Sequence, residues 1–154
     1  MTTGNSRISI SELDRTESDA LLGRNHFGRI AYSFHDRVSI EPLSYVFDRD
    51  WIFGRTSPGT KWLTLLHHPW VAFEVEEIVS EVEWKTVVVH GTVTFIDHTG
   101  TPSNRELFER AVARIQSRTP LALTENDRAP ERDRVFGIHI NDLSGRQCTT
   151  VPVE

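Results

Sequence analysis

The nine residues 54–62 combine the residue types that bind a phosphate group. They read GRTSPGTKW and join a strand-like run, 51–53, to a helix-like run, 62–66. Two glycines, several hydroxyls, Arg55 and Lys61 at such a junction can direct backbone N–H groups, hydroxyl donors and fixed positive charge at one anion. We therefore interpret this segment as a phosphate-binding site.

Two alternatives compete with this interpretation. Gly54 and Gly59 have the spacing of the nucleotide-binding motif G-x-x-x-x-G-K-[ST], which would indicate an NTPase. Here the motif ends in the reversed order Thr60-Lys61, so no hydroxyl follows the lysine to bind Mg²⁺. The second alternative is that Arg55 and Lys61 are solvated charges beside a turn. We favour the phosphate site because hydroxyls, glycines and both cations occur together, and we expect the preceding Arg29 to lie outside it.

The sequence shows no protein nucleophile or metal-binding motif. Seven histidines are present, but none form an H-x-H or H-x-x-x-H pair, and the adjacent His67 and His68 would point about 100° apart on a helix. His90 faces the hydroxyl-rich side of its strand, where it is either a polar cavity residue or an ordinary surface or core imidazole. The catalytic residues are thus unknown, and a binding site without a nucleophile is expected where a cofactor carries the reaction.

Length and composition limit the class of protein. The 154 residues, 38% of them apolar, are enough for one domain with a core, spanning residues 1–154. A net charge of −5 argues against binding to nucleic acid or to an anionic membrane. Cys148 is the only cysteine, which excludes an intramolecular disulfide. With neither an apolar leader among the first thirty residues nor a run of about 18 apolar residues, we expect a soluble, cytoplasmic protein.

Hydrophobic periodicity predicts a mainly β protein with flanking helices. The expected strands are 29–33, 37–47, 51–53, 70–76, 83–96 and 135–140, with a bulge at Gly91 and a turn at Ser144-Gly145. The first three should form an antiparallel meander. Helices are expected after a capping box at 11–14, over 60–67, and after a second capping box at 103–106, followed by a polar loop over 116–134. About six strands with few helices suggest a small barrel.

The order and spacing of several segments resemble the FMN-binding split-barrel family, often called pyridoxamine 5'-phosphate oxidase-like. The matching segments are Gly28-Arg29-Ile30-Ala31, Ile40-Glu41-Pro42-Leu43-Ser44-Tyr45, Ile52-Phe53-Gly54-Arg55-Thr56, Gly59-Thr60-Lys61, Val71-Ala72-Phe73-Glu74-Val75, Trp84-Lys85-Thr86-Val87-Val88-Val89-His90-Gly91 and Ser144-Gly145-Arg146. The resemblance implies a six-stranded Greek-key split β-barrel that forms a homodimer, with flavin at the subunit interface.

The resemblance also assigns the cofactor-binding residues. It implies that Arg55, Thr56, Thr60 and Lys61 hold the phosphate of FMN. The backbone of Glu41, Pro42, Leu43 and Ser44 would line the isoalloxazine ring, and Thr86 would add a polar contact. Trp84-Lys85-Thr86-Val87 departs from the W-S-V pattern of small members. The C-terminal Trp and Arg segment of true oxidases is not found after Arg146, so pyridoxamine phosphate oxidation is not expected.

The sequence leaves three alternative functions open. The first is an FMN-dependent oxidoreductase that passes electrons from a reduced nicotinamide to a small-molecule acceptor. The second is a non-enzymatic protein, related to stress or storage, that binds flavin, deazaflavin or haem, since family members also use deazaflavin, FAD and haem. The third is a dimeric barrel without a cofactor.

Overall fold

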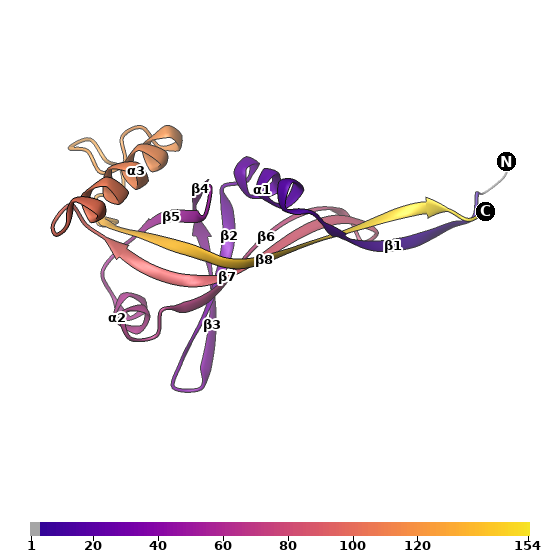
Figure 1. The fold of residues 1–154 in the computed structure, drawn as a ribbon, viewed down its shortest axis with the longest axis horizontal. Coiled ribbons are helices and arrows are strands. Elements are labelled where there is room, and N and C mark those ends of the chain that lie inside the picture. The colour runs from indigo at the N-terminus through magenta and orange to yellow at the C-terminus, as the bar shows by residue number, and fades with distance from the viewer. Residues whose placement is uncertain (1–3) are drawn as a thin grey trace.

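The computed structural model describes residues 4–154, in which eight strands and three helices are formed. In chain order the elements are β1 (Ser6–Leu13), α1 (Arg15–Arg24), β2 (Phe27–Phe34), β3 (Arg37–Ser44), β4 (Val46–Asp48), β5 (Trp51–Thr56), α2 (Thr60–His67), β6 (Trp70–Ser80), β7 (Glu83–Ile96), α3 (Pro102–Arg118) and β8 (Arg134–Pro152). Figure 1 shows the long strands β6, β7 and β8 running through the molecule, with α1 and α3 above them and α2 below.

All strands belong to one open antiparallel sheet. Its order is β3-β2-β6-β7-β8-β5-β4, and β1 pairs with β8 beside this path. The sheet has two strands more than expected, because β1 was not predicted and the run 37–47 is split into β3 and β4.

The expected meander of the first strands is wrong. β2 pairs with β3 and β4 with β5, but β3 and β4 lie at opposite ends of the sheet. The expected strand 37–47 is interrupted at Tyr45. The N–H of Tyr45 donates to the carbonyl of His26, and its buried hydroxyl donates to the carbonyl of Leu22 at 2.7 Å. Because Tyr45 bonds to residues near the end of α1, it does not pair with β2 as the residues of β3 do. The chain therefore changes direction here, and β4 pairs with β5.

The turn expected at Ser144-Gly145 is also wrong, because β8 runs straight through it for 19 residues. Gly145 pairs with Leu13 of β1 and with Val87 of β7. A Cβ atom at Gly145 would collide with the hydroxyl of Ser18 in α1. The glycine therefore permits close packing of a helix against the sheet and does not mark a turn. Beyond it, β1 and β8 form a ribbon that extends away from the body (Figure 1).

Both predicted capping boxes are misplaced by two or three residues. The N-cap of α1 is Asp14, which accepts from the N–H of Glu17 at 2.8 Å while its own N–H donates to the Glu17 carboxylate at 3.2 Å. Ser11, the expected cap, instead belongs to β1. The cap of α3 is Thr101, whose hydroxyl accepts from the N–H of Asn104, and Pro102 occupies the first turn.

The core lies in two clusters on the two sides of β5. One cluster packs α1 against the sheet and includes Leu21, Phe73 and Val89. The other packs α3 against β4, β5 and β8 through residues such as Ala111 and Ile115, which lie on one face of the helix. The bulge predicted at Gly91 is confirmed by a register shift between His90 and Gly91. Between residues 4 and 154 there is no helix with the length and apolarity to cross a membrane.

Candidate functional site

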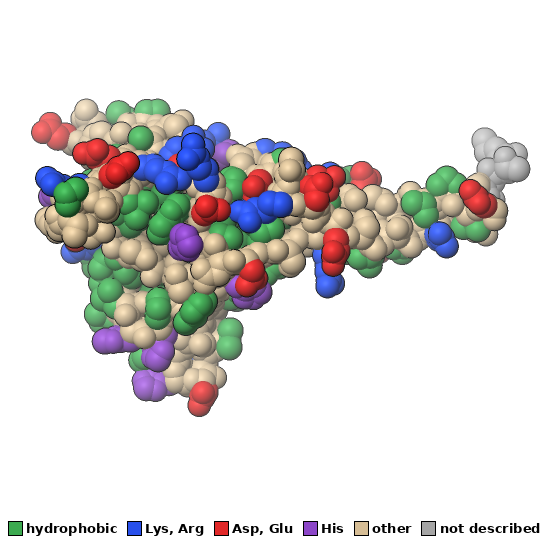
Figure 2. Space-filling view, in the orientation of Figure 1, with side chains coloured by type: hydrophobic (Ala, Val, Ile, Leu, Met, Phe, Trp, Pro, Cys, Tyr) green, Lys and Arg blue, Asp and Glu red, His purple; other side chains and the backbone are tan. Residues whose placement is uncertain are grey.

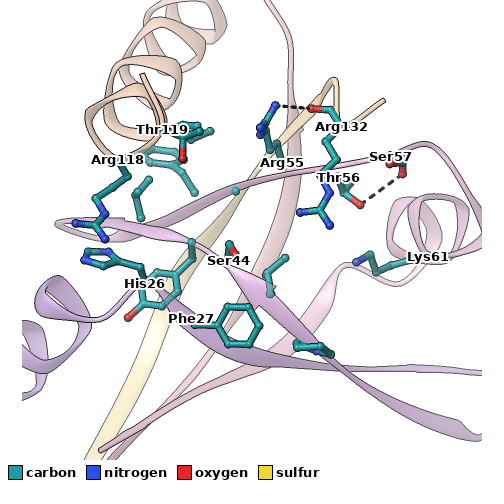
Figure 3. A pocket seen from close by; sticks show the side chains of 17 residues that line it. His26, Phe27, Ser44, Arg55, Thr56, Ser57, Lys61, Arg118, Thr119 and Arg132 are labelled. Atoms are coloured by element: carbon teal, nitrogen blue, oxygen red, sulfur yellow. Dashed lines mark hydrogen bonds between the residues drawn. The ribbon is translucent and has the colours of Figure 1, made fainter. Parts of the chain in front are cut away.

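A pocket of about 520 Å³ lies where the two ends of the open sheet approach each other (Figure 3). It is bounded by the first residues of β2, the end of β3, the end of β5, the start of α2 and the last turn of α3. The lining residues are His26, Phe27, Pro42, Leu43, Ser44, Tyr45, Val46, Phe53, Gly54, Arg55, Thr56, Ser57, Lys61, Ile115, Arg118, Thr119 and Arg132.

The structure brings six of the nine predicted cofactor-binding residues to this pocket. These are Pro42, Leu43, Ser44, Arg55, Thr56 and Lys61. Glu41, Thr60 and Thr86 do not line it. Glu41 nevertheless contacts Lys61 directly, and Thr60 is the exposed first residue of α2.

Gly54 allows β5 to approach the end of β3 without pairing with it. A Cβ atom at this position would lie 2.6 Å from the ring of Phe136 and 3.2 Å from the carbonyl oxygen of Ser44. Any larger residue would push the two strands apart or displace the Phe136 ring. The glycine of the predicted phosphate segment therefore shapes the pocket between β3 and β5.

Lys61 projects from the first turn of α2 to one end of the pocket. Its Nζ lies 2.9 Å from Oε2 of Glu41, and the hydroxyl of Tyr32 donates to the other oxygen of this carboxylate at 2.9 Å. Burial alone would raise the pKa of Glu41, but the bonds from Lys61 and Tyr32 outweigh it and the pKa is lowered. Glu41 thus stays ionised and positions the ammonium group, a role that its side chain was not expected to have.

Arg55 serves both the pocket and the loop that follows α3. Its two terminal nitrogens donate to the carboxylate of Asp127, whose side chain is only 4% exposed. Asp127 also accepts from the N–H groups of Leu123 and Ala129, at 2.7 and 3.0 Å. The bonds from Arg55 and from these two N–H groups hold the pKa of Asp127 well below its usual range.

The hydroxyls of the predicted phosphate segment are only partly gathered. The Thr56 hydroxyl donates to the carbonyl of Ser57 at 3.4 Å, and both residues line the pocket near Arg55 (Figure 3). The N-cap of α2 is Gly59, and no side chain caps this helix end. Backbone N–H groups at the start of α2 are therefore not satisfied by a capping side chain.

Sequence reasoning missed the opposite end of the pocket, which is lined by His26, Arg118 and Thr119. His26 belongs to the link between α1 and β2, and Arg118 is the last residue of α3. Burial, and then the charge of Arg118, lower the pKa of His26. The only local signal for Arg118 was a basic residue in the last helical turn, which is ordinarily explained by the helix dipole.

Four other residues singled out in the sequence lie outside the pocket. Thr86 is in β7 opposite Glu76 and Arg146, on the face that points away from the buried Val87. Arg29 is on the same outward face, where it pairs with Glu76 at 2.9 Å. His90 is exposed, with its Nδ1 3.3 Å from the carboxylate of Asp142. Cys148 is buried in the ribbon part of β8.

Solved structures with this fold include three flavin-binding proteins. A FAD-binding protein from Mesorhizobium loti superimposes with a TM-score of 0.71 and 23% identity, over 90% of this chain and 97% of that one. The FAD-binding protein from Mycobacterium smegmatis gives 0.59 and 19%, over 90% and 98%. The FAD- and haem-binding protein from the same organism gives 0.67 and 16%, over 94% and 76%. At these identities the likeness establishes the fold.

The family itself is established by the sequence. No curated protein sequence matches the chain. The family model described as pyridoxamine 5'-phosphate oxidase matches residues 14–147, which includes the pocket and both of its charged ends. The resemblance found in the motifs is thereby confirmed, and the chain belongs to the pyridoxamine 5'-phosphate oxidase family.

Proposed function

We propose that this protein binds FMN in the pocket and acts as a flavin-dependent oxidoreductase. The observation that carries the proposal is the cationic end of the pocket, which is lined by Arg55, Thr56, Ser57 and Lys61. The family match and the FAD-binding relatives support a flavin as the ligand. FMN is our choice among the flavins because one phosphate accounts for this cationic end.

The residues present fit such a ligand in size and charge. The volume of about 520 Å³ lies within the range of roughly 300–1,000 Å³ that is usual for cofactor sites. Arg55 has five N–H donors, of which the contacts to Asp127 and to the carbonyl of Arg132 use only some. Lys61 has three N–H donors and one carboxylate partner, Glu41, so it can donate to a phosphate as well.

The chain's own residues would bind and orient the cofactor. Lys61, Arg55 and Thr56 would donate to the phosphate. Thr60, the first residue of α2, directly precedes Lys61 in the sequence. The ring would lie against the backbone of Pro42, Leu43 and Ser44, with the exposed side chain of Phe27 at its edge. Flavin, when bound, supplies the redox chemistry by accepting a hydride from a reduced nicotinamide and passing electrons to a small acceptor.

We further propose that two copies of the chain form a homodimer. The outward face of β2 and β3 carries exposed apolar side chains beside the pocket, including Val38 at 79%, Ile40 at 66% and Phe27 at 62%. Figure 2 shows hydrophobic side chains at the surface around β3 and α2. Such an apolar face, next to a ligand pocket, is typical of a protein interface.

A homodimer would also account for Thr86. This residue is on the outward face of the sheet and away from the pocket of its own chain, so a contact with flavin would come from Thr86 of the partner subunit. The six-stranded Greek-key split barrel of the family remains part of the proposal. The approach of β5 to the end of β3 without a ladder supports it.

Flavin titrations test the proposed function. Quenching of flavin fluorescence gives the dissociation constants of FMN and riboflavin for the wild type, for Lys61→Ala and for the control Lys85→Ala. Lys85 is the only other lysine and is exposed in β7. A lost charged hydrogen bond of about 1.5–3 kcal/mol should weaken FMN binding by on the order of 10- to 100-fold in Lys61→Ala. Riboflavin, which has no phosphate, should be little affected.

Two results would contradict the proposal. Equal losses for FMN and riboflavin would show that Lys61 supports the loop and not the phosphate, and absence of any loss would remove the main argument for a nucleotide cofactor. Steady-state consumption of reduced nicotinamide by the FMN-loaded protein separates the enzyme from the alternative, a flavin-, deazaflavin- or haem-binding protein without turnover. The absorbance spectrum and the mass of the ligand released from protein made in its native host identify the natural cofactor.

A further inference from the structure

We propose that Tyr32 is a positioning residue for the phosphate site, because its hydroxyl fixes the Glu41 carboxylate that holds the ammonium group of Lys61. Tyr32 belongs to β2 and does not line the pocket, so it would act on a ligand only through these two side chains. The proposal rests on the proposed function, in which Lys61 donates to the phosphate of a flavin.

The pairing of β2 with β3 brings Tyr32 within reach of Glu41. Tyr32 lies directly opposite Ser39, and Glu41 is two residues further along β3. Side chains alternate between the faces of a strand, so Ser39 and Glu41 share the face of Tyr32, and diagonal neighbours in an antiparallel pair can meet through long side chains. The Tyr32 hydroxyl donates to Oε1 of Glu41 at 2.9 Å. The contact therefore follows from the register of two strands.

The Glu41 carboxylate links Tyr32 to Lys61. Its Oε1 accepts from Tyr32, and its Oε2 lies 2.9 Å from Nζ of Lys61, so each oxygen has one partner and the carboxylate is oriented from both sides. Burial raises the pKa of Glu41, but the bonds from Lys61 and then Tyr32 outweigh it, and the carboxylate stays ionised. Burial, and then the bond to Glu41, raise the pKa of Tyr32. Its hydroxyl therefore keeps its proton and remains a donor at neutral pH.

Lys61 is held along its whole length. With Ile30, Leu43 and Trp62 it lines a second cavity of about 10 Å³, which is too small for a ligand, so its stem lies beside apolar side chains. Figure 3 shows the side chain directed from α2 into the main pocket. Among residues 4–154, Glu41 is its only ion-pair partner.

This arrangement prepares Lys61 for binding. A lysine has a flexible four-carbon stem, and ordering it when a ligand arrives costs entropy. A lysine that is already held by a carboxylate avoids most of that cost, since binding is stronger when the site is preorganised. Tyr32 would therefore strengthen the binding of a phosphate that it does not touch.

The two lysines of the chain allow a test without any flavin. Lys61 and Lys85 are the only lysines, so acetylation of both can be followed in one sample by mass spectrometry of peptides. A hydrogen-bonded ammonium group is acetylated more slowly than a free one. Tyr32→Phe removes the donor and keeps the ring, and it should raise the rate of Lys61 relative to Lys85 by about twofold or more. The urea midpoint of the variant shows that it is folded.

Flavin titrations test whether the effect reaches the phosphate. Tyr32→Phe should weaken FMN binding by about three- to tenfold, the usual effect of one hydrogen bond, while riboflavin binding stays within about twofold. In the Lys61→Ala background, the same change should alter FMN affinity by no more than about twofold, because residues that act on one interaction are not additive. A structural defect at Tyr32 would weaken both flavins and would persist without Lys61.

Glu41→Gln interrupts the same link from the other side. The amide keeps the shape of the side chain but loses the charge that holds Lys61, so acetylation of Lys61 should rise and FMN binding should fall by about three- to tenfold. Glu74→Gln is the matched control, because Glu74 is in β6, lies 3.8 Å from Arg29 and does not line the pocket. It should change neither measurement.

Three results would overturn the proposal. The first is an unchanged acetylation ratio in Tyr32→Phe, and the second is an unchanged FMN affinity in Tyr32→Phe when Lys61→Ala weakens FMN binding. The third is tighter FMN binding in Glu41→Gln, which would show that the carboxylate only neutralises the lysine. Failure of the proposed function is distinguishable, because it would appear as unchanged FMN binding in Lys61→Ala. The acetylation ratio would then still decide whether Tyr32 positions Lys61.

Discussion

Arg55 of β5 and Asp127 of the loop after α3 form a two-point ion pair at the edge of the pocket. The pair joins residues 72 positions apart in the sequence. Both side chains are largely buried, with 14% of Arg55 and 4% of Asp127 exposed. Asp127 also accepts two backbone N–H groups of its own loop. A single carboxylate therefore ties residues 123–129 of this loop to β5 and holds a predicted phosphate-binding arginine in place.

Asp127→Asn should release this loop. The amide keeps the shape of the side chain but loses the charge that accepts from Arg55, so the urea midpoint should fall. Trypsin should also cut after Arg128 and Arg132 several-fold faster than in the wild type, because both lie in the released loop. Asp133→Asn, at an exposed carboxylate, is the control. Unchanged proteolysis in Asp127→Asn would show that the pair does not order the loop.

Arg29→Ala should leave FMN affinity within about threefold, or under ~0.7 kcal/mol. Arg29 is on the outward face of β2, where it pairs with Glu76 and lies 3.8 Å from Glu74, and it does not line the pocket. The same fluorescence titration used for Lys61→Ala measures the effect. A loss comparable to that of Lys61→Ala would mean that the phosphate site extends to the outward face of the sheet.

Light scattering at micromolar concentration with added FMN should give the mass of a homodimer. Ile40→Glu should shift this mass toward the monomer, because it places a charge on the exposed apolar face of β3. Leu121→Glu, a similar change in the loop after α3, should not. If the wild type itself has the mass of one chain, the homodimer and the proposed contact from Thr86 of the partner subunit are both wrong.

The contact between Glu77 and the end of α1 should make stability depend on pH below about 4.5. Hydrogen bonds from Arg24 and Asn25, partly opposed by burial, lower the pKa of Glu77 from 4.5 to about 2. A carboxylate with a depressed pKa stabilises the folded state fully above its unfolded pKa, and this contribution is lost as the pH falls toward 2.

Glu77→Gln should therefore cost on the order of 1 kcal/mol at pH 7, a modest value because the Arg24 pair is partly exposed to solvent. The difference in free energy of unfolding between wild type and variant should shrink as the pH is lowered from about 5 to 2. Urea unfolding at several pH values measures it, with Glu81→Gln, at an exposed position of the same hairpin, as the control. A difference that is constant over this range would show that the ionised carboxylate contributes nothing.

Features that depend on neighbours in the chain could be predicted from the sequence. The helix at 60–67, the strand at 83–96 and the bulge at Gly91 follow from hydrophobic periodicity and from one glycine, and the structure has all three. The family also follows from short motifs in a fixed order. The helix caps were wrongly placed, although Ser11 and Ser103 have the side chains of an N-cap. Ser11 pairs within β1, and the cap of α3 is Thr101.

Features that depend on contacts between distant segments could not be predicted from neighbouring residues. Gly145 was expected to mark a turn, and it is instead the point at which α1 packs on β8. The residue that lies against it there, Ser18, is far from it in the sequence. Likewise, the split of 37–47 at Tyr45 depends on partners near the end of α1. Neither partner can be identified from the residues that adjoin the glycine or the tyrosine.

For the site, the sequence alone determined which residue types meet an anion: the glycines, hydroxyls, Arg55 and Lys61 between β5 and α2. Only the tertiary structure decided what those charges face. Glu41 comes to Lys61 from β3, Asp127 comes to Arg55 from the loop after α3, and Arg118 comes to His26 from the end of α3. The physical reason is that ion pairs and pKa shifts depend on distance in space, which the folding of one open sheet sets and the spacing of residues along the chain does not.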